Sequence, residues 1–129
     1  MTFKIYDYVN ASGENEIKTW TKSLQKTQRG KLSEKIDKLI LYGDGLYPKM
    51  LTGTDEPGIQ KLRIRGNVEL RPLLCKGPIN TNEEYTLLKG AKEVGDKLIP
   101  QDSLEKAKQH KAAIKLDPNS RRKIHERIL

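Results

Sequence analysis

Residues 60–71 read Gln-Lys-Leu-Arg-Ile-Arg-Gly-Asn-Val-Glu-Leu-Arg, and this stretch decides the fold. Apolar and charged side chains alternate on both sides of the central Gly-Asn, which predicts a β-hairpin. A two-residue turn would mix charges into the apolar face. A three-residue loop instead pairs Ile64 with Val68, and the next apolar pair is then Leu62 with Leu70. In this register the opposite face of the hairpin carries four charged residues, namely Lys61, Arg63, Glu69 and Arg71.

A helical hairpin is expected between an N-terminal strand and this β-hairpin. Residues 3–9 alternate in polarity and predict the strand. Ser12 or Asn15 can cap the helix that follows, because either side chain accepts a hydrogen bond from the first turn. Two apolar stripes at helical spacing predict two helices. The stripes consist of Ile17, Trp20 and Leu24, and of Leu32, Ile36, Leu39 and Ile40. Gly43 is the expected C-cap, and residues 43–58 are expected to form a long loop.

The remaining elements complete an α+β domain. Residues 84–89 predict a third strand of the meander, and residues 92–97 a polar connection. Residues 102–105 have the spacing of a capping box at the start of a C-terminal helix. We therefore expect one domain over residues 1–116, in which a helical hairpin packs on a twisted antiparallel sheet. Residues 117–129 form a basic tail that either docks as a helix or stays loose.

The charge of the chain is concentrated in its second part. Residues 59–129 contain sixteen Lys and Arg against nine Asp and Glu, and so carry +7 of the total charge of +8. Residues 1–58 are nearly neutral. A one-sided positive charge of this size favours a nucleic-acid-facing surface. The alternative is a solvated face that only aids solubility.

Several kinds of chemistry lack support in the sequence. Two histidines and one cysteine show no metal-ligand spacing, and no phosphate-binding or dinucleotide-binding glycine motif is present. We therefore expect no metal and no cofactor. Cys75 lies in an apolar stretch and is expected to be a packed residue. A single cysteine, the absence of a long apolar run and a polar N-terminus favour a cytoplasmic protein without contact with membranes.

A cationic surface can support RNA cleavage without a metal. The substrate's own 2′-hydroxyl attacks the neighbouring phosphate, and the protein moves protons and stabilises negative charge. Arginine suits the phosphate because its planar fork matches two oxygens. Lysine can transfer protons where burial or neighbouring cations lower its pKa. A basic β-face that only binds phosphates is the alternative.

Specific residues also resemble a known family. Five features occur in a fixed order along the chain: Leu62-Arg63, Arg-Pro-Leu-Leu at residues 71–74, Leu-Leu-Lys-Gly-Ala-Lys-Glu at residues 87–93, Pro100, and a helix with a central Ala107. In this order they resemble the HigB/RelE-like, phage-derived toxins of type II toxin–antitoxin systems. Two positions depart from the family pattern: Ala91 stands where the family has an aromatic residue, and Glu93 stands where it has a lysine.

The resemblance implies a RelE/ParE-like fold and a metal-independent endoribonuclease that cuts mRNA on the ribosome and inhibits translation. It also implies a cognate antitoxin, with a helix-turn-helix type expected. The alternatives are a ParE-type gyrase inhibitor without nuclease chemistry and an inactive family member. The expected catalytic residues are Arg71, Arg63, Lys89, Lys92 and His110. The expected RNA-binding residues are Lys61, Arg65, Lys76, Lys108 and Lys111. Because Arg71 belongs to no apolar face in this hairpin, we expect Arg71→Ala to abolish toxicity and to leave the fold intact.

Overall fold

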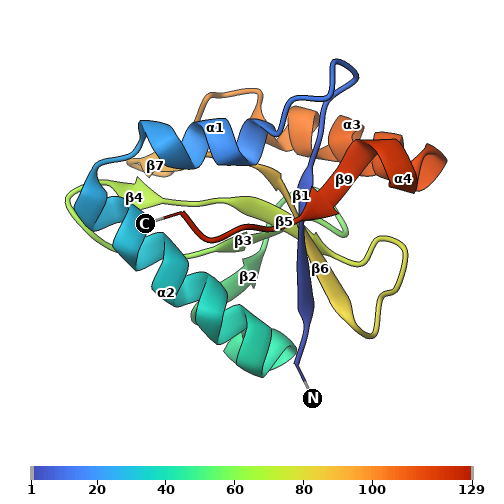
Figure 1. The fold of residues 1–129 in the computed structure, drawn as a ribbon. Coiled ribbons are helices and arrows are strands. Elements are labelled where there is room, and N and C mark those ends of the chain that lie inside the picture. The colour runs from blue at the N-terminus through green and yellow to red at the C-terminus, as the bar shows by residue number, and fades with distance from the viewer. Residues whose placement is uncertain (1, 129) are drawn as a thin grey trace.

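The computed structural model describes residues 2–128, which form an α+β fold with a mixed sheet (Figure 1). The elements in chain order are β1 (Lys4–Tyr8), α1 (Glu16–Ser23), α2 (Lys26–Tyr42), the 3₁₀-helix η1 (Gly43–Leu46), β2 (Leu51–Gly53), β3 (Gln60–Leu62), β4 (Glu69–Leu70), β5 (Leu73–Lys76), β6 (Glu84–Lys89), β7 (Lys92–Val94), β8 (Lys97–Ile99), α3 (Ser103–Leu116), α4 (Pro118–Arg121) and β9 (Arg122–Ile124). None of the helices described is long and apolar enough to cross a membrane.

The main sheet has six strands in the order β2-β3-β5-β6-β1-β9. β3, β5 and β6 form an antiparallel meander, but its middle strand is β5 and not the predicted residues 68–71, of which β4 pairs in a different sheet. β1 runs parallel to β6, so the expectation of a purely antiparallel sheet was wrong. The physical reason is the connection: α1 and α2 carry the chain away from β1, and the later meander brings β6 alongside it in the same direction.

Both faces of this sheet are buried. α1 and α2 form a V-shaped hairpin over one face (Figure 1), where Ile17, Leu32 and Leu39 belong to a core cluster with the sheet residue Leu87. On the opposite face α3 places Ala107 and Ile114 in a second cluster, and the neighbouring sheet residue Leu88 belongs to this one. Adjacent residues of β6 therefore serve different layers, as the period of two in a strand requires. Trp20 packs at the edge of the first cluster, against Gly90, where a Cβ atom would meet the indole ring.

The central hairpin keeps the predicted faces but not the predicted register. Ile64 exchanges backbone hydrogen bonds with Leu70, at 3.1 and 3.0 Å, rather than pairing with Val68. The slip of two residues leaves Leu62, Ile64 and Leu70 buried, because only a slip by an odd number would turn them outward. The loop is correspondingly longer, and Val68 is only partly buried.

A second, three-stranded sheet in the order β4-β7-β8 was not predicted. The polar stretch at 92–97 forms most of it, since β7 and β8 are joined by a turn at Gly95, whose φ is +62°. These strands are short and largely exposed, so they lack the apolar alternation by which a strand is recognised in a sequence.

The helix ends follow the sequence in two places and depart from it in two. Asn15 accepts from the Lys18 amide at 2.9 Å and caps α1, and Gly43 ends α2 with φ +47°, as expected. The Asp102 side chain makes no capping hydrogen bond, so the predicted capping box is absent. Residues 43–58 also contain η1 and β2 and are not one long loop.

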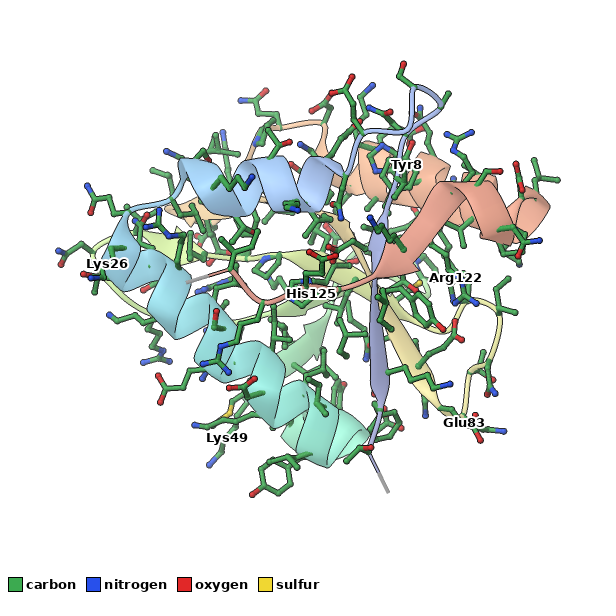
Figure 2. All side chains as sticks on the ribbon, viewed as in Figure 1. Tyr8, Lys26, Lys49, Glu83, Arg122 and His125 are labelled. Atoms are coloured by element: carbon green, nitrogen blue, oxygen red, sulfur yellow. The ribbon has the colours of Figure 1, made fainter. Side chains whose placement is uncertain are left out.

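The C-terminal tail begins with the short helix α4, but residues 122–124 dock as the strand β9, which neither alternative expected for the tail included; Figure 2 labels Arg122 at its start and His125 just after its end. β9 pairs antiparallel with β1 and covers the edge that β1 would otherwise expose. The following residue, His125, contacts the buried carboxylate of Asp7 at 2.8 Å, and Arg122 pairs with the buried Glu84. Buried carboxylates require partners, and this segment supplies two of them.

Candidate functional site

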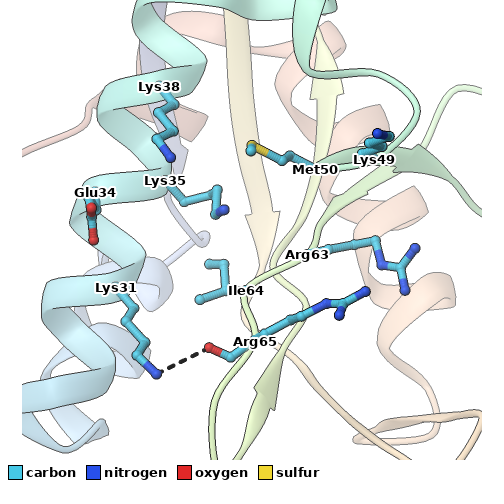
Figure 3. A pocket seen from close by; sticks show the side chains of 9 residues that line it. All are labelled: Lys31, Glu34, Lys35, Lys38, Lys49, Met50, Arg63, Ile64 and Arg65. Atoms are coloured by element: carbon cyan, nitrogen blue, oxygen red, sulfur yellow. Dashed lines mark hydrogen bonds between the residues drawn. The ribbon is translucent and has the colours of Figure 1, made fainter.

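A cleft of about 410 Å³ separates α2 from the strand segment that follows β3 (Figure 3). Lysine side chains extend into it from α2, while Ile64 and Met50 point toward the helix from the other side. Arg63 and Arg65 extend from the strand on the side away from α2, as Figure 3 shows. The residues that line the cleft are Lys31, Glu34, Lys35, Lys38, Lys49, Met50, Arg63, Ile64 and Arg65.

The helix side of the cleft follows from the periodicity of α2. Lys31, Lys35 and Lys38 are spaced four and three residues apart, so they lie along one face of the helix. Each of them directly precedes a residue of the buried stripe, which consists of Leu32, Ile36 and Leu39. Neighbouring residues on a helix are about 100° apart around its axis, so the lysines stand beside the face that packs on the sheet.

The strand side of the cleft is held by backbone hydrogen bonds. The Arg63 amide donates to the Met50 carbonyl at 2.9 Å, which fixes the segment after η1 beside this strand. Lys31 Nζ donates to the Arg65 carbonyl at 3.3 Å and links the helix to the far end of the strand. The two sides of the cleft are therefore positioned by regular structure.

The cleft is strongly cationic. Six of its lining residues are Lys or Arg, and Glu34 is its single carboxylate. No ion pair within residues 2–128 involves any of these six cations. Partial burial lowers the pKa of Lys35, and the positive charge of Lys38 lowers it further, against a smaller opposing effect of Glu34. Such an arrangement can bind phosphates, and it contains one lysine suited to proton transfer.

Two of the three cations in the cluster that the hairpin register predicted, Lys61 and Arg71, are neutralised. Glu69 of β4 lies opposite Glu93 of β7 in the small sheet. Arg71 Nη2 lies 2.6 Å from the Glu69 carboxylate and 3.5 Å from that of Glu93, and Lys61 Nζ lies 3.2 Å from Glu93. Arg71 is only 2% exposed and also donates to the Leu70 carbonyl. Arg71 is thus unavailable to a phosphate in this structure. Its removal is expected to destabilise the fold, contrary to the expectation that Arg71→Ala leaves the fold intact.

His110 is neither an exposed helical residue nor a group that faces the cleft. Its ring stacks on that of Tyr8, with centroids 3.7 Å apart, and Nδ1 lies 2.8 Å from the Leu88 carbonyl oxygen. Burial is the main reason that its pKa lies below the usual value. This histidine belongs to the packing between α3 and the sheet, so its expected catalytic role has no support in the geometry.

The other predicted site residues are dispersed. Lys76 pairs with Asp44, Lys108 with Glu56, and Lys111 donates to the Gly58 carbonyl. Lys89 ends β6 and Lys92 begins β7, outside the cleft. Of the ten predicted site residues, two line the cleft: Arg63 and Arg65.

Sequence reasoning missed four cations of the cleft, namely Lys31, Lys35, Lys38 and Lys49. All four lie within residues 1–58, whose near-neutral total charge drew attention away from them. The spacing of the three helix lysines, at positions i, i+4 and i+7, is the signal that could have identified them.

Neither the single cysteine nor any cluster of metal-ligating side chains forms a second site in residues 2–128. Burial raises the pKa of the Cys75 thiol to about 12, which fits the packed role expected of it and does not fit a nucleophile. Within residues 2–128, no three His, Cys, Asp or Glu side chains are grouped so as to hold a metal ion.

Comparison with protein-family models, with curated proteins and with solved structures found no match to this chain.

Proposed function

We propose that this protein is a toxin of the HigB/RelE-like type that binds mRNA through the cleft between α2 and the segment after β3 and cleaves it without a metal. The observation that carries the proposal is the cleft itself, in which six cations meet one carboxylate and form no ion pairs in the part of the chain described. A phosphate backbone is the ligand whose charge complements such a row of cations. The order of strand, helical hairpin, meander and helix supports the resemblance.

Cleavage of RNA by its own 2′-hydroxyl requires proton transfer and stabilisation of negative charge on the phosphate. The 2′-hydroxyl loses its proton and its oxygen attacks the adjacent phosphorus, the bond from phosphorus to the 5′-oxygen breaks, and that oxygen takes up a proton. The products are a 2′,3′-cyclic phosphate and a 5′-hydroxyl. Lys35 is the candidate for proton transfer because its pKa is lowered, and the other lysines of the cleft are the candidates for stabilising negative charge on the phosphate.

A second candidate function is favoured by Glu93. In the family that the sequence resembles, a lysine occupies this position, and here the carboxylate pairs with both Lys61 and Arg71. A chain in which Lys61 and Arg71 are neutralised in this way would retain RNA binding in the cleft and lack cleavage. Such a protein would inhibit translation by occupancy or would have lost toxicity.

Controlled expression separates these candidates. The proposal expects growth arrest, new 5′ ends in cellular mRNA that map to defined positions, and cleavage that persists in the presence of a chelator. Arrest without new 5′ ends would favour the non-cleaving candidate, and inhibition of DNA supercoiling by the purified protein would favour the gyrase-inhibiting alternative. Co-expression with the product of a neighbouring gene is expected to relieve the arrest and to yield a stable complex.

A further inference from the structure

Exposed apolar side chains gather where α2 ends. Seven large hydrophobic side chains are exposed among residues 2–128, and three of them lie between positions 41 and 47. These are Leu41, Tyr42 and Tyr47, with exposed fractions of 57, 60 and 58%. Both tyrosine rings are therefore available to a ligand.

Tyr42 continues the lysine row of the cleft. Positions 31, 35, 38 and 42 follow one another at spacings of four, three and four, so they fall within an arc of about 60° on the helix. Tyr42 is the last residue of α2 and stands one turn, about 6 Å along the axis, beyond Lys38. An aromatic ring thus ends a row of three cations on the same helix face.

Tyr47 lies on the segment that carries Lys49 to the opposite side of the cleft. The turn of η1 holds this segment, because the Tyr47 amide donates to the Asp44 carbonyl at 3.1 Å and the Met50 amide to the Leu46 carbonyl at 3.0 Å. The Tyr47 side chain itself lines a separate pocket together with Lys76 and Lys111, so Tyr42 is the ring that continues the lysine row of the cleft.

We propose that Tyr42 is a base-stacking platform at the end of the cationic cleft. The proposal rests on the proposed function in one respect, namely that RNA phosphates bind along Lys31, Lys35 and Lys38. A cationic groove with aromatic side chains is the usual design for binding unpaired nucleic acid, since phosphates follow the cations and bases stack on the rings. The bound RNA must then present an unpaired base at Tyr42, which a duplex does not offer.

The test separates stacking from phosphate binding. Binding of a short oligouridylate is measured by fluorescence anisotropy, beside an abasic strand with the same number of phosphates. Tyr42→Ala is expected to weaken binding of the oligouridylate by about 5- to 100-fold and to leave the abasic strand unaffected. Tyr42→Phe should bind like the unmodified protein, because the ring is retained. Ile79→Ala, which truncates an exposed apolar side chain in the β5–β6 connection, is the matched control.

A fluorescent variant gives a second readout. Tyr42→Trp is expected to bind oligouridylate and to show quenched emission from the new indole, measured against the emission of Trp20 in the unmodified protein. Equal affinity of Tyr42→Ala and the unmodified protein would overturn the stacking proposal, as would an equal loss for both strands. Loss of a complex with a protein partner, with RNA affinity intact, would also overturn it and assign the surface to that partner.

The charge-reversed pair Lys35→Glu and Lys38→Glu shows which part has failed. If this pair removes RNA binding and Tyr42→Ala does not, the stacking proposal alone is wrong. If the pair leaves RNA binding intact, the cleft does not bind RNA, and both proposals fail.

Discussion

The cations of the central hairpin differ in whether they are paired with carboxylates, and the difference follows their position along the hairpin. At the cleft, Arg63 and Arg65 join the lysines of α2 and meet one carboxylate. Near the small sheet, Lys61 and Arg71 meet Glu69 and Glu93 and are paired. All four cations belong to one stretch of alternating sequence. The difference lies in what other elements bring to each position, so the availability of a charge is a property of the tertiary structure.

Reversing the charge of the cleft should have the largest effect on RNA affinity. Lys35→Glu with Lys38→Glu is expected to weaken RNA binding by more than about 100-fold at moderate salt, because two charged contacts are lost and two repulsions appear. The dependence of affinity on salt should also become shallower, since fewer counterions are released. Anisotropy titrations over a range of salt concentrations measure both.

The matched control changes the same charge elsewhere. Lys106→Glu with Lys115→Glu alters two exposed positions of α3 that do not line the cleft. This variant is expected to keep most of the affinity. An equal loss in both double variants would mean that the total charge, rather than the cleft, governs binding.

Arg71→Ala should affect stability where Arg63→Ala affects binding. Removal of the buried Arg71 side chain leaves two carboxylates facing each other and is expected to cost about 2 kcal/mol of unfolding free energy, a value reduced because both carboxylates remain partly hydrated. Urea unfolding measures this loss, and RNA affinity should be unchanged in the folded fraction. Arg63→Ala should show the opposite pattern. An Arg71→Ala protein of normal stability that binds no RNA would reverse our assignment of the paired and unpaired cations.

What could be predicted from the sequence depended on local pattern. The faces of the hairpin, the stripe of α2, the cap at Asn15 and the end of α2 at Gly43 are encoded within a few residues, and the structure has them. The register of the hairpin is less local. A shift by two residues keeps Leu62, Ile64 and Leu70 on the same face, so alternation alone does not choose between the two registers.

The candidate site could be predicted only in part, because it joins distant segments. Arg63 and Arg65 were identified by their strand, whereas the lysines of α2 were hidden by a neutral total charge in their part of the chain. The neutralisation of Arg71 depends on the pairing of β4 with β7, and the position of β9 depends on the buried Asp7. Neither of these long-range pairings has a signal in the local sequence.

Glu93→Gln should free Lys61 from its ion pair. The amide keeps the shape of the side chain and removes the charge that holds Lys61, while Glu69 still pairs with Arg71. We expect RNA affinity to rise by about 2- to 5-fold, the scale of one partly exposed ion pair. Glu105→Gln, at an exposed position of α3, makes the same change of charge and should have less effect. No gain relative to this control would mean that Lys61 lies outside the path of the RNA.

The smallest effect concerns pH and Lys35. Burial and the neighbouring Lys38 lower the pKa of this lysine in the free protein, so it loses its proton at a lower pH than an ordinary lysine does. The protonated form binds phosphate, and RNA affinity should therefore fall as the pH rises through the lowered pKa of Lys35. Lys35→Arg should remove this early decline, because a guanidinium stays protonated throughout the range. Affinity measured between neutral and alkaline pH gives both curves, with Lys38→Arg as the control that leaves Lys35 beside a cation. If the unmodified protein and Lys35→Arg decline together, Lys35 is not held in contact with the RNA phosphates, and the proton-transfer role proposed for it is lost as well.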